Sequence, residues 1–593
     1  MRSPLFENAI GLCYNPLESR RYECNFHVLG RTIMSKSYKK KHLIEIDREL
    51  STISQKVTLS GKDLTISNIH AVSSTGAKTF ITTADRVQEK VRKSYQVMLS
   101  NIKQGIPVYG SNTAFGGQAG RILNKGDIKK RIDEARKLSE GLVFLDVGVG
   151  TQLPQVIVKG AMIIRINMLL QGVSGIRLET LDILRKMLNK QIIPIVPEYG
   201  GIGASGDLIH NQRVVSAMRG LPGVKVINEK GKKEEAKDAL ERNNIPLLQL
   251  DPKEGLALVN GDNFSTSFAV HLVIQVIECI LIGKVVGAMV IEVLKGTNRS
   301  FHPLLAEVRP HQGQKESADI YRYLLQGSKL AHQELTGHKV KNNGVKVQDA
   351  YSLRGLSQFE GVWIDKLKWI LETIAINANS VSDNPLWVPD GSTTRGEEPW
   401  QWVSGGNFLA MHMVEVLDSI RKIMTQLVKR NDRHLARLID PSDNNGLPAN
   451  LSDPENSTTQ CSFKGIQIQM GMFEIYSMIL ANPVSTLFGV HEERNQDITS
   501  HATTSGNLGL KNLEIVQYSL ASNLLALAQA VDLRGGPSLL APHTRPMYEL
   551  IRKHSERITK DRPLHSDLEK ITGLIKDGTM IKYVRSKIYT EFV

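Results

Sequence analysis

Long segments with helical hydrophobic spacing dominate the second half of the chain. Apolar side chains recur at i, i+3, i+4 and i+7 over 20 or more residues at 262–295, 355–380, 406–438, 464–490 and 506–533. Helices this long and this apolar bury their surfaces only by packing against one another. The pattern therefore predicts a mostly α-helical fold built on a bundle of long central helices.

The first half predicts a smaller, mixed region. Residues 84–104 and 127–145 have helical spacing with charged outer faces, while strand-like pieces are short and confined to this half. Residues 389–404 mix proline, glycine, threonine and acidic side chains, and are predicted to form a surface loop. No repeat of 20–50 residues is visible, which argues against a solenoid.

These changes divide the 593 residues into four segments. Residues 1–61 form an N-terminal extension without clear periodicity, which is expected to carry no chemistry. This extension has no apolar core followed by a small-residue cleavage site, as a secretory signal would. Residues 62–262 form the mixed region, 263–540 the helix bundle, and 541–593 a C-terminal helical segment.

The most apolar stretch, residues 268–294, predicts a buried helix. Polar side chains interrupt it at His271, Gln275, Glu278 and Lys284, which argues against a membrane span. The chain has only four scattered cysteines, too few for a disulfide framework or a zinc site. We therefore expect a cytoplasmic protein that does not associate with a membrane.

The basic balance of the chain raises the question of a nucleic-acid partner. There are 74 Lys and Arg residues against 60 Asp and Glu, a formal charge of +14. Nucleic-acid binders concentrate basic residues on a face or an arm. Here residues 1–50 hold nine basic against six acidic residues, the remaining excess is spread along the chain, and only 6% of residues are aromatic. We expect no nucleic-acid partner.

A glycine-rich segment at 201–206, Gly-Ile-Gly-Ala-Ser-Gly, matches the dinucleotide-binding pattern G-x-G-x-x-G, with Glu229 downstream where a ribose contact would lie. That pattern requires a preceding central strand within a βαβ unit. The preceding residues 193–197 contain two prolines, which suit an edge or a turn, and no alternation of strands and helices follows. The pattern therefore argues against a dehydrogenase.

Ala204, Ser205 and Gly206 within this segment suggest a different chemistry. Glycine has the least hindered amide nitrogen, which can approach the carbonyl carbon two residues earlier. Attack of the Gly206 nitrogen on the Ala204 carbonyl, with loss of water, would close a five-membered ring. Loss of the Ser205 hydroxyl as a second water would leave an exocyclic methylidene, a strong electrophile. Ala-Ser-Gly alone is common in ordinary turns, so the surrounding motifs must decide.

Seven motifs supply that context over about residues 62–590. They are Gly203-Ala-Ser-Gly-Asp-Leu208, Lys253-Glu-Gly-Leu-Ala-Leu-Val-Asn-Gly261, Gln348-Asp-Ala-Tyr-Ser-Leu-Arg354, Ser382-Asp-Asn-Pro-Leu386, Gly405-Gly-Asn-Phe408, Asn445-Gly-Leu-Pro448 and Asn495-Gln-Asp497. In this order they resemble the aromatic amino acid ammonia-lyases and aminomutases. The resemblance implies the helical fold of the histidine and phenylalanine ammonia-lyases, with the prosthetic-group loop on the mixed region.

The resemblance also implies a reaction and a cofactor. Ammonia leaves an aromatic α-amino acid to give an α,β-unsaturated acid. The electrophile is a methylidene-imidazolone formed autocatalytically from Ala204, Ser205 and Gly206, with no metal and no soluble cofactor. The family is homotetrameric, and its active sites are built from three subunits.

By the same resemblance, Tyr109 is the base that removes the β-proton. A free phenol has a pKa near 10, so Tyr109 requires nearby donors or positive charge to stabilise its phenolate. Tyr351 is implied as a lid residue over the prosthetic group. Arg354 is implied as the anchor of the substrate carboxylate, because its planar fork matches two oxygens.

Further residues are implied to surround the substrate, as polar positioning groups, ring contacts or rim residues. They are Leu256, Asn260, Gln348, Asn384, Phe408, Lys429, Gln467 and Gln496. Phe144 and Leu145 fall where the family distinguishes aromatic rings. Tyrosine- and histidine-directed members tend to have histidine at the first of these positions, so Phe144 favours an unsubstituted phenyl ring. The alternative is that Phe144 is simply a core residue.

The sequence departs from the family pattern at several positions. His210 and Asn211 replace Pro-Leu, Asp262 replaces threonine, Ala114 replaces glycine, and Gly141 replaces a bulkier apolar residue. The sequence favours a phenylalanine ammonia-lyase that releases trans-cinnamate. It leaves open a phenylalanine or tyrosine 2,3-aminomutase, a tyrosine or histidine ammonia-lyase, and a non-catalytic relative.

Overall fold

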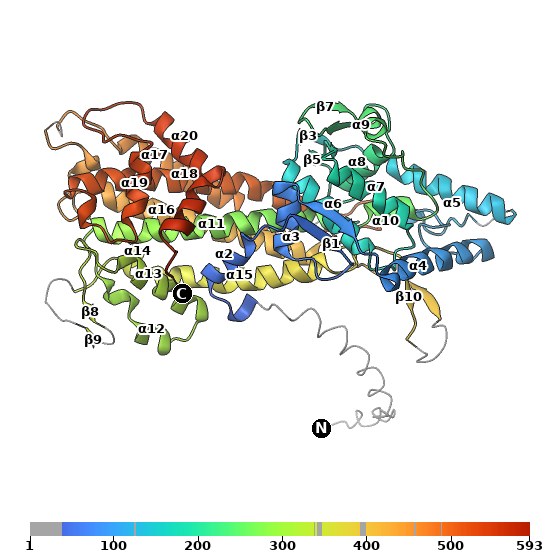
Figure 1. The fold of residues 1–593 in the computed structure, drawn as a ribbon, viewed down its shortest axis with the longest axis horizontal. Coiled ribbons are helices and arrows are strands. Elements are labelled where there is room, and N and C mark those ends of the chain that lie inside the picture. The colour runs from blue at the N-terminus through green and yellow to red at the C-terminus, as the bar shows by residue number, and fades with distance from the viewer. Residues whose placement is uncertain are drawn as a thin grey trace, which may run out of the picture.

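The computed structural model describes residues 38–123, 126–336, 339–340, 347–391, 399–455, 458–487 and 489–592. This part of the chain forms an elongated, mostly helical molecule (Figure 1). Most of the predicted N-terminal extension, residues 1–37 with Cys13 and Cys24, lies outside the described residues.

The predicted bundle of long helices is confirmed. Its members are α11 (Asn263–Val293), α15 (Leu356–Ala378), α16 (Met411–Ile439), α17 (Lys464–Leu480) and α18 (Ala502–Leu533). The prediction for α17 was ten residues too long, because Pro483 follows the helix and disfavours helical backbone in the residue before it. Helix α18 begins four residues earlier than its hydrophobic pattern suggested.

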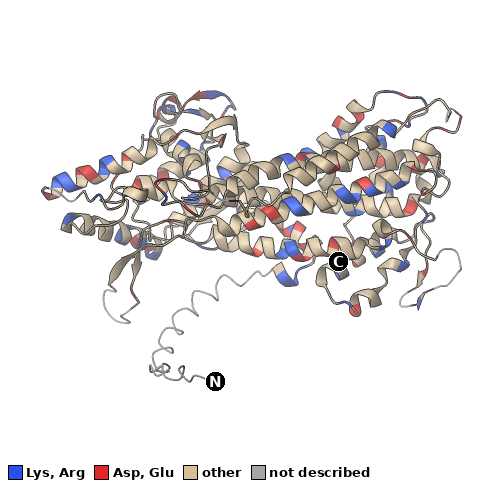
Figure 2. Cartoon of the chain, turned by 180° about the vertical axis from the view of Figure 1, so that it is seen from behind, with Lys and Arg blue, Asp and Glu red and all other residues tan. Residues whose placement is uncertain are grey.

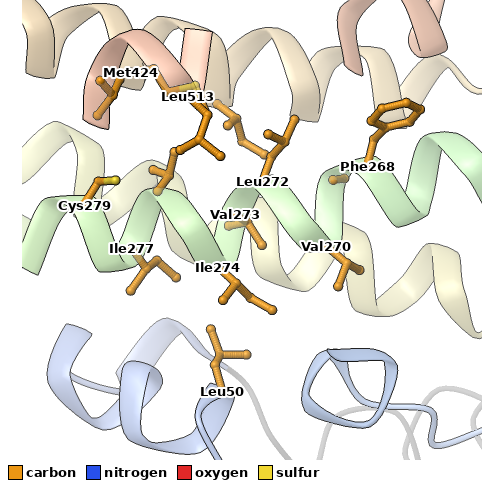
Figure 3. Packing of buried hydrophobic residues seen from close by; sticks show 14 of the residues in the cluster. Leu50, Phe268, Val270, Leu272, Val273, Ile274, Ile277, Cys279, Met424 and Leu513 are labelled. Carbon is orange, nitrogen blue, oxygen red and sulfur yellow. The ribbon is translucent and has the colours of Figure 1, made fainter. Parts of the chain in front are cut away.

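Helix α11 forms the centre of the core. Its 31 residues are long and apolar enough to cross a membrane, but 89% of its most apolar window is buried inside the protein. Figure 3 shows its apolar side chains packed among those of neighbouring elements, with Leu50 on one side and Met424 and Leu513 on the other. The buried Lys284 forms an ion pair with Glu360 of α15, which compensates its charge. The expectation of a buried helix is confirmed.

The mixed region combines helices with very small sheets. The main helices of this region are α4 (Asp85–Gln104), α5 (Ile128–Val143), α6 (Gln155–Leu169), α7 (Leu178–Asn189), α8 (Leu208–Met218), α9 (Ala236–Arg242) and α10 (Glu254–Val259). Strand β3 (Val149–Gln152) pairs with β5 (Pro197–Tyr199). Strand β4 (Ile193–Pro194) lies at the edge of an antiparallel sheet with β6 (Lys225–Ile227) and β7 (Lys233–Glu235). The proline-containing segment is therefore an edge, as predicted, and the glycine-rich loop has no βαβ unit around it.

Three local predictions were wrong. The N-terminal extension contains α2 (Leu43–Leu50), whose apolar side is buried against the bundle, and β1 (Lys56–Leu59), which pairs with β2 (Lys78–Ile81). Strands also occur in the second half, as β8 (Leu335–Thr336) with β9 (Lys339–Val340). The predicted surface loop carries β10 (Leu386–Pro389) and β11 (Trp400–Val403), whose cross-strand tryptophans Trp387 and Trp402 pair in register. These pieces are too short to have a visible period in the sequence.

Short helices complete the subunit. They are α3 (Ile66–His70), α12 (Pro303–Glu307), α13 (Gln312–Leu325), α14 (Tyr351–Arg354), α19 (Arg545–Arg552), α20 (His565–Lys576) and α21 (Thr579–Lys587). Basic and acidic residues are interspersed along the helices (Figure 2). The charge excess is thus distributed over the described surface.

Candidate active site

The Ala204-Ser205-Gly206 triad lies in a tight turn between two glycines with left-handed backbone. Gly203 has φ of 74° and Gly206 φ of 64°, a region that disfavours other residues. A β-bridge joins Gly203 to Gly206, so Ala204 and Ser205 form the tip of the turn. Ala204 is buried and Ser205 half-buried. The sequence therefore bends the chain back on itself at the three residues predicted to react.

Neighbouring backbone compresses this turn from two sides. A Cβ on Gly206 would lie 2.4 Å from the carbonyl carbon of Gly261, and a Cβ on Gly203 would lie 2.0 Å from Ser500 Oγ. The Asp207 amide donates a hydrogen bond to Gly261 O at 2.8 Å. Only glycine fits at these two positions. The triad is therefore held in a crowded turn, as expected if its own backbone atoms form the prosthetic group.

Tyr109 lies in the first glycine-rich loop, half-buried beside the ring of Phe115. The loop packs closely on Leu256 of α10, because a Cβ on Gly110 would lie 2.5 Å from Leu256 Cδ2. Tyr109 Oη accepts a hydrogen bond from the Gly116 amide at 3.1 Å. Burial raises the pKa of Tyr109, the Gly116 hydrogen bond partly opposes this rise, and the Glu492 carboxylate adds to it. The expected stabilisation of the phenolate is therefore not supplied by the described part of one chain.

Three of the motifs meet at a buried amide cluster. Asn260 Nδ2 donates to Asn384 O and to Asp383 Oδ1, both at 3.2 Å. Asn384 Oδ1 accepts the Gly405 amide at 2.8 Å. Lys253 forms a buried ion pair with Asp383. The predicted positioning amides Asn260 and Asn384 thus lie together, and the half-buried Phe408 follows three residues after Gly405.

Phe144 and Leu145 lie at the C-terminal end of α5 and are 65% and 52% exposed. Gln212 Nε2 of α8 donates to Leu142 O at 2.7 Å. This hydrogen bond joins the end of α5 to α8, the helix that follows the triad. The Arg219 guanidinium lies 5.6 Å from the Phe144 ring centroid. Open space surrounds Gly141, where a Cβ would meet nothing within 4 Å. The alternative that Phe144 is a core residue is therefore wrong.

One acidic residue that the sequence did not reveal, Glu492, rests against the Tyr109 loop. A Cβ on Gly116 would lie 2.2 Å from Glu492 Cδ, so this carboxylate rests against the backbone beside Tyr109. The half-buried Gln496 donates from Nε2 to Glu492 Oε2 at 2.6 Å. Glu492 could have been found from its position four residues before Gln496 in the matched region.

Five predicted residues lie elsewhere, at the far end of the bundle. Gln348 is exposed just before α14, Tyr351 is 80% exposed, and the Arg354 guanidinium lies 4.7 Å from the Tyr351 ring centroid. His434 Nε2 hydrogen-bonds Ser352 O at 2.8 Å and anchors α14 to α16. Tyr351 and Lys429 line an open depression of about 560 Å³. Gln467 is exposed near the start of α17.

The long helices of the bundle separate the site residues near the triad from those near α14. The His501 amide at the start of α18 donates to Ile202 O beside the triad, whereas Ser519 of the same helix contacts Asn431 of α16. The path from His501 to Ser519 along α18, followed by one further turn of α16 from Asn431 to His434, spans about 30 Å at a rise of 1.5 Å per residue. Figure 1 shows α8 and α14 in opposite halves of the elongated molecule. One chain therefore does not bring all the predicted residues together.

The structure thus combines a bundle of long helices with a crowded Ala-Ser-Gly turn whose glycines have left-handed backbone. The sequence model described as Aromatic amino acid lyase matches residues 64–553. The chain belongs to the aromatic amino acid lyase family, and it is an enzyme of the ammonia-lyase and aminomutase group.

The similar proteins carry the names of enzymes for different amino acids. The chain is 33% identical to a phenylalanine ammonia-lyase of Nostoc punctiforme over 505 residues, 84% of this chain and 86% of that protein. It is 33% identical to a histidine ammonia-lyase of Myxococcus xanthus over 485 residues, 81% of this chain and 89% of that protein. A tyrosine aminomutase structure from Streptomyces globisporus matches with a TM-score of 0.80 and 27% identity, covering 90% of this chain and 99% of that one. These likenesses support the family without selecting the substrate.

Proposed function

We propose that this enzyme eliminates ammonia from L-phenylalanine and releases trans-cinnamate. The observation that carries the proposal is the exposed apolar pair Phe144 and Leu145 beside the helix that leads from the triad. An apolar wall suits an unsubstituted phenyl ring, whereas a ring hydroxyl without a partner would cost about 1–3 kcal/mol. The likeness to the Nostoc phenylalanine ammonia-lyase supports the same choice.

We propose that Ala204, Ser205 and Gly206 form a methylidene-imidazolone. This group supplies an electrophile that captures the substrate amine and makes it a better leaving group. The two left-handed glycines, the Gly203–Gly206 bridge and the close backbone of Gly261 support the proposal, because they hold the triad in a tight, crowded turn. We further propose that no metal or soluble cofactor takes part. The described cysteines, Cys279 and Cys461, are free, which supports the proposal that the enzyme works in a reducing compartment such as the cytoplasm.

We propose that Tyr109 removes the β-proton and that Arg354 binds the substrate carboxylate. In one chain, burial and the Glu492 carboxylate hold the pKa of Tyr109 above its ordinary value, which favours the neutral phenol. The base form requires positive charge near Oη. Arg354 of a neighbouring subunit would bring such a charge into the site.

A neighbouring subunit is required because the two groups of site residues lie about 30 Å apart in one chain. We propose a homotetramer whose active sites are shared between subunits. The bundle exposes apolar side chains that such an assembly would cover, among them Val362 and Ile376 on α15 and Ile468 and Ile475 on α17.

Product analysis after incubation with L-phenylalanine tests the proposed function. We expect trans-cinnamate and ammonia in equal amounts. β-Phenylalanine as the main product would identify an aminomutase instead. Product from tyrosine or histidine but not from phenylalanine would overturn the substrate assignment, and no product from any of the three would identify a non-catalytic relative.

Selectivity for the ring should depend on Phe144. Phe144→His adds a hydrogen-bonding partner for a para-hydroxyl and removes apolar surface from the phenyl site. We expect the ratio of kcat/KM for tyrosine over phenylalanine to rise about 10- to 150-fold. Steady-state kinetics on both substrates, with the mass of the purified chain as a control for the prosthetic group, would measure this. An unchanged ratio in a folded variant of correct mass would show that Phe144 does not contact the ring.

A further inference from the structure

A buried pair of side-chain amides lies directly behind the triad turn. Asn211 on α8 and Asn263 at the start of α11 exchange two hydrogen bonds, Nδ2 to Oδ1 in each direction, both at 2.9 Å. Both side chains are at least 97% buried. Asn263 Nδ2 also donates to Ala161 O at 3.1 Å, which fixes the pair to α6. The amide pair is therefore held rigidly within the core.

The same pair holds the backbone that presses on Gly206. Asn211 Nδ2 lies 3.2 Å from Val259 O and 3.1 Å from Gly261 O. The carbonyl between them, Asn260 O, accepts instead from Arg165 at 3.0 Å. Three successive carbonyls at the end of α10 are thus held by the buried side chains of Asn211 and Arg165.

Gly261 O connects this segment to the triad. It accepts the Asp207 amide at 2.8 Å, and that amide belongs to the peptide group formed with the carbonyl of Gly206. Gly206 and Gly261 also form a parallel bridge. A shift of Gly261 would therefore move Gly206, whose nitrogen must reach the Ala204 carbonyl carbon.

We infer that Asn211 is a positioning residue for formation of the prosthetic group, an inference that rests on the proposed methylidene-imidazolone. The ring-closing bond joins the Gly206 nitrogen to the Ala204 carbonyl carbon. The Ala204 oxygen departs as water with the amide hydrogens of Gly206 and Ser205. The Ser205 hydroxyl and Cα hydrogen depart as a second water. Asn211 touches none of these atoms and acts through the carbonyl of Gly261.

The test substitution keeps the branched arrangement of heavy atoms. Leucine has the same branching as asparagine, with bulkier methyl groups, so Asn211→Leu removes every hydrogen bond of the side chain. Mispositioning reacting atoms by about 1 Å can cost about 100-fold in rate. Asn211→Leu should therefore slow ring closure by about tenfold or more.

The test follows ring formation itself. The wild-type chain and Asn211→Leu are synthesised in a cell-free system, and intact mass is recorded over time for the folded fraction. Wild-type chains should become lighter by two waters, about 36 Da. Asn523→Leu is the matched control, because Asn523 is also a fully buried amide that donates to backbone carbonyls, at Asn431 and Ser519, but near the far end of the bundle.

The expected result is slow mass loss in Asn211→Leu and wild-type mass loss in Asn523→Leu, with comparable decreases in melting temperature. Equal rates in Asn211→Leu and the wild type would overturn the inference. Equal slowing in both variants would also overturn it, because the effect would then be one of general stability. A wild-type chain that never loses the two waters would instead contradict the proposed prosthetic group.

Asn263→Ala provides a second test of the inference in case Asn211→Leu does not fold. It keeps the contacts of Asn211 with Val259 O and Gly261 O but removes the partner that orients the amide. We expect about threefold slower mass loss in this variant, smaller than in Asn211→Leu because the direct contacts remain. Wild-type maturation in a folded Asn263→Ala would contradict the role of the pair.

Discussion

Ser205→Ala should lower turnover of the aromatic amino acid by about three powers of ten or more. The substitution removes the hydroxyl that departs as the second water, so no methylidene can form. The backbone of the turn should be unaffected, because Gly203 and Gly206 set its conformation. Initial-rate measurements with sensitive detection of product, together with intact mass, would test this prediction.

The mass measurement separates chemistry from folding. The wild-type chain should be lighter than its sequence by about 36 Da, whereas Ser205→Ala should not show this loss of two waters. Ser522→Ala is a suitable control, because Ser522 is a buried serine of α18 whose hydroxyl donates only to Tyr518 O among the described contacts. Full activity in folded Ser205→Ala would remove the central claim about the triad.

Mixing two inactive variants should restore activity. Ser205→Ala disables the triad group, and Arg354→Ala disables the carboxylate anchor at the other end of the bundle. If each active site combines these groups from different subunits, random mixed tetramers should contain about one quarter intact sites. Subunits denatured and refolded together should therefore recover about a quarter of wild-type activity, compared with almost none for either variant alone.

The activity of the mixture depends on whether one chain or two chains supply the triad and Arg354 to each active site. Sites built within one chain would remain inactive after mixing, because each chain carries one defective group. Refolding of each variant alone is the control for recovery by the procedure itself. Sedimentation should show a tetramer for the wild type and for the mixture, and a fully active monomer at high dilution would contradict shared sites.

The long helices were predictable because their signal is repeated many times. In α11 nearly every residue is buried, and in α16 the apolar residues return at helical spacing over eight turns. Strands such as β8 and β10 have two and four residues, too few for an alternating pattern. The helix α2 was missed because it lies in a segment whose polar and basic composition hides its buried face.

The candidate residues were found through ordered motifs, and the structure arranges them differently from a single pocket. The Tyr109 loop packs on Leu256 of α10, and the Gly206–Gly261 bridge joins the triad to the end of the same helix, beside Asn260. Glu492 lies four residues before Gln496, but its contact with Gly116 beside Tyr109 is visible only in the tertiary structure. The raised pKa of Tyr109 likewise arises from burial and from that carboxylate, neither of which is local in sequence.

By itself, the sequence determined the helical class, the candidate triad and the family resemblance, because these depend on local periodicity and on residues adjacent in the chain. Only the tertiary structure decided that Phe144 is exposed, that Asn211 supports Gly261, and that Arg354 lies about 30 Å from Ser205 along the bundle. These facts depend on how helices far apart in sequence pack side by side. A rigid helix separates its two ends by its own length, so a site that needs residues from both ends must draw them from more than one chain.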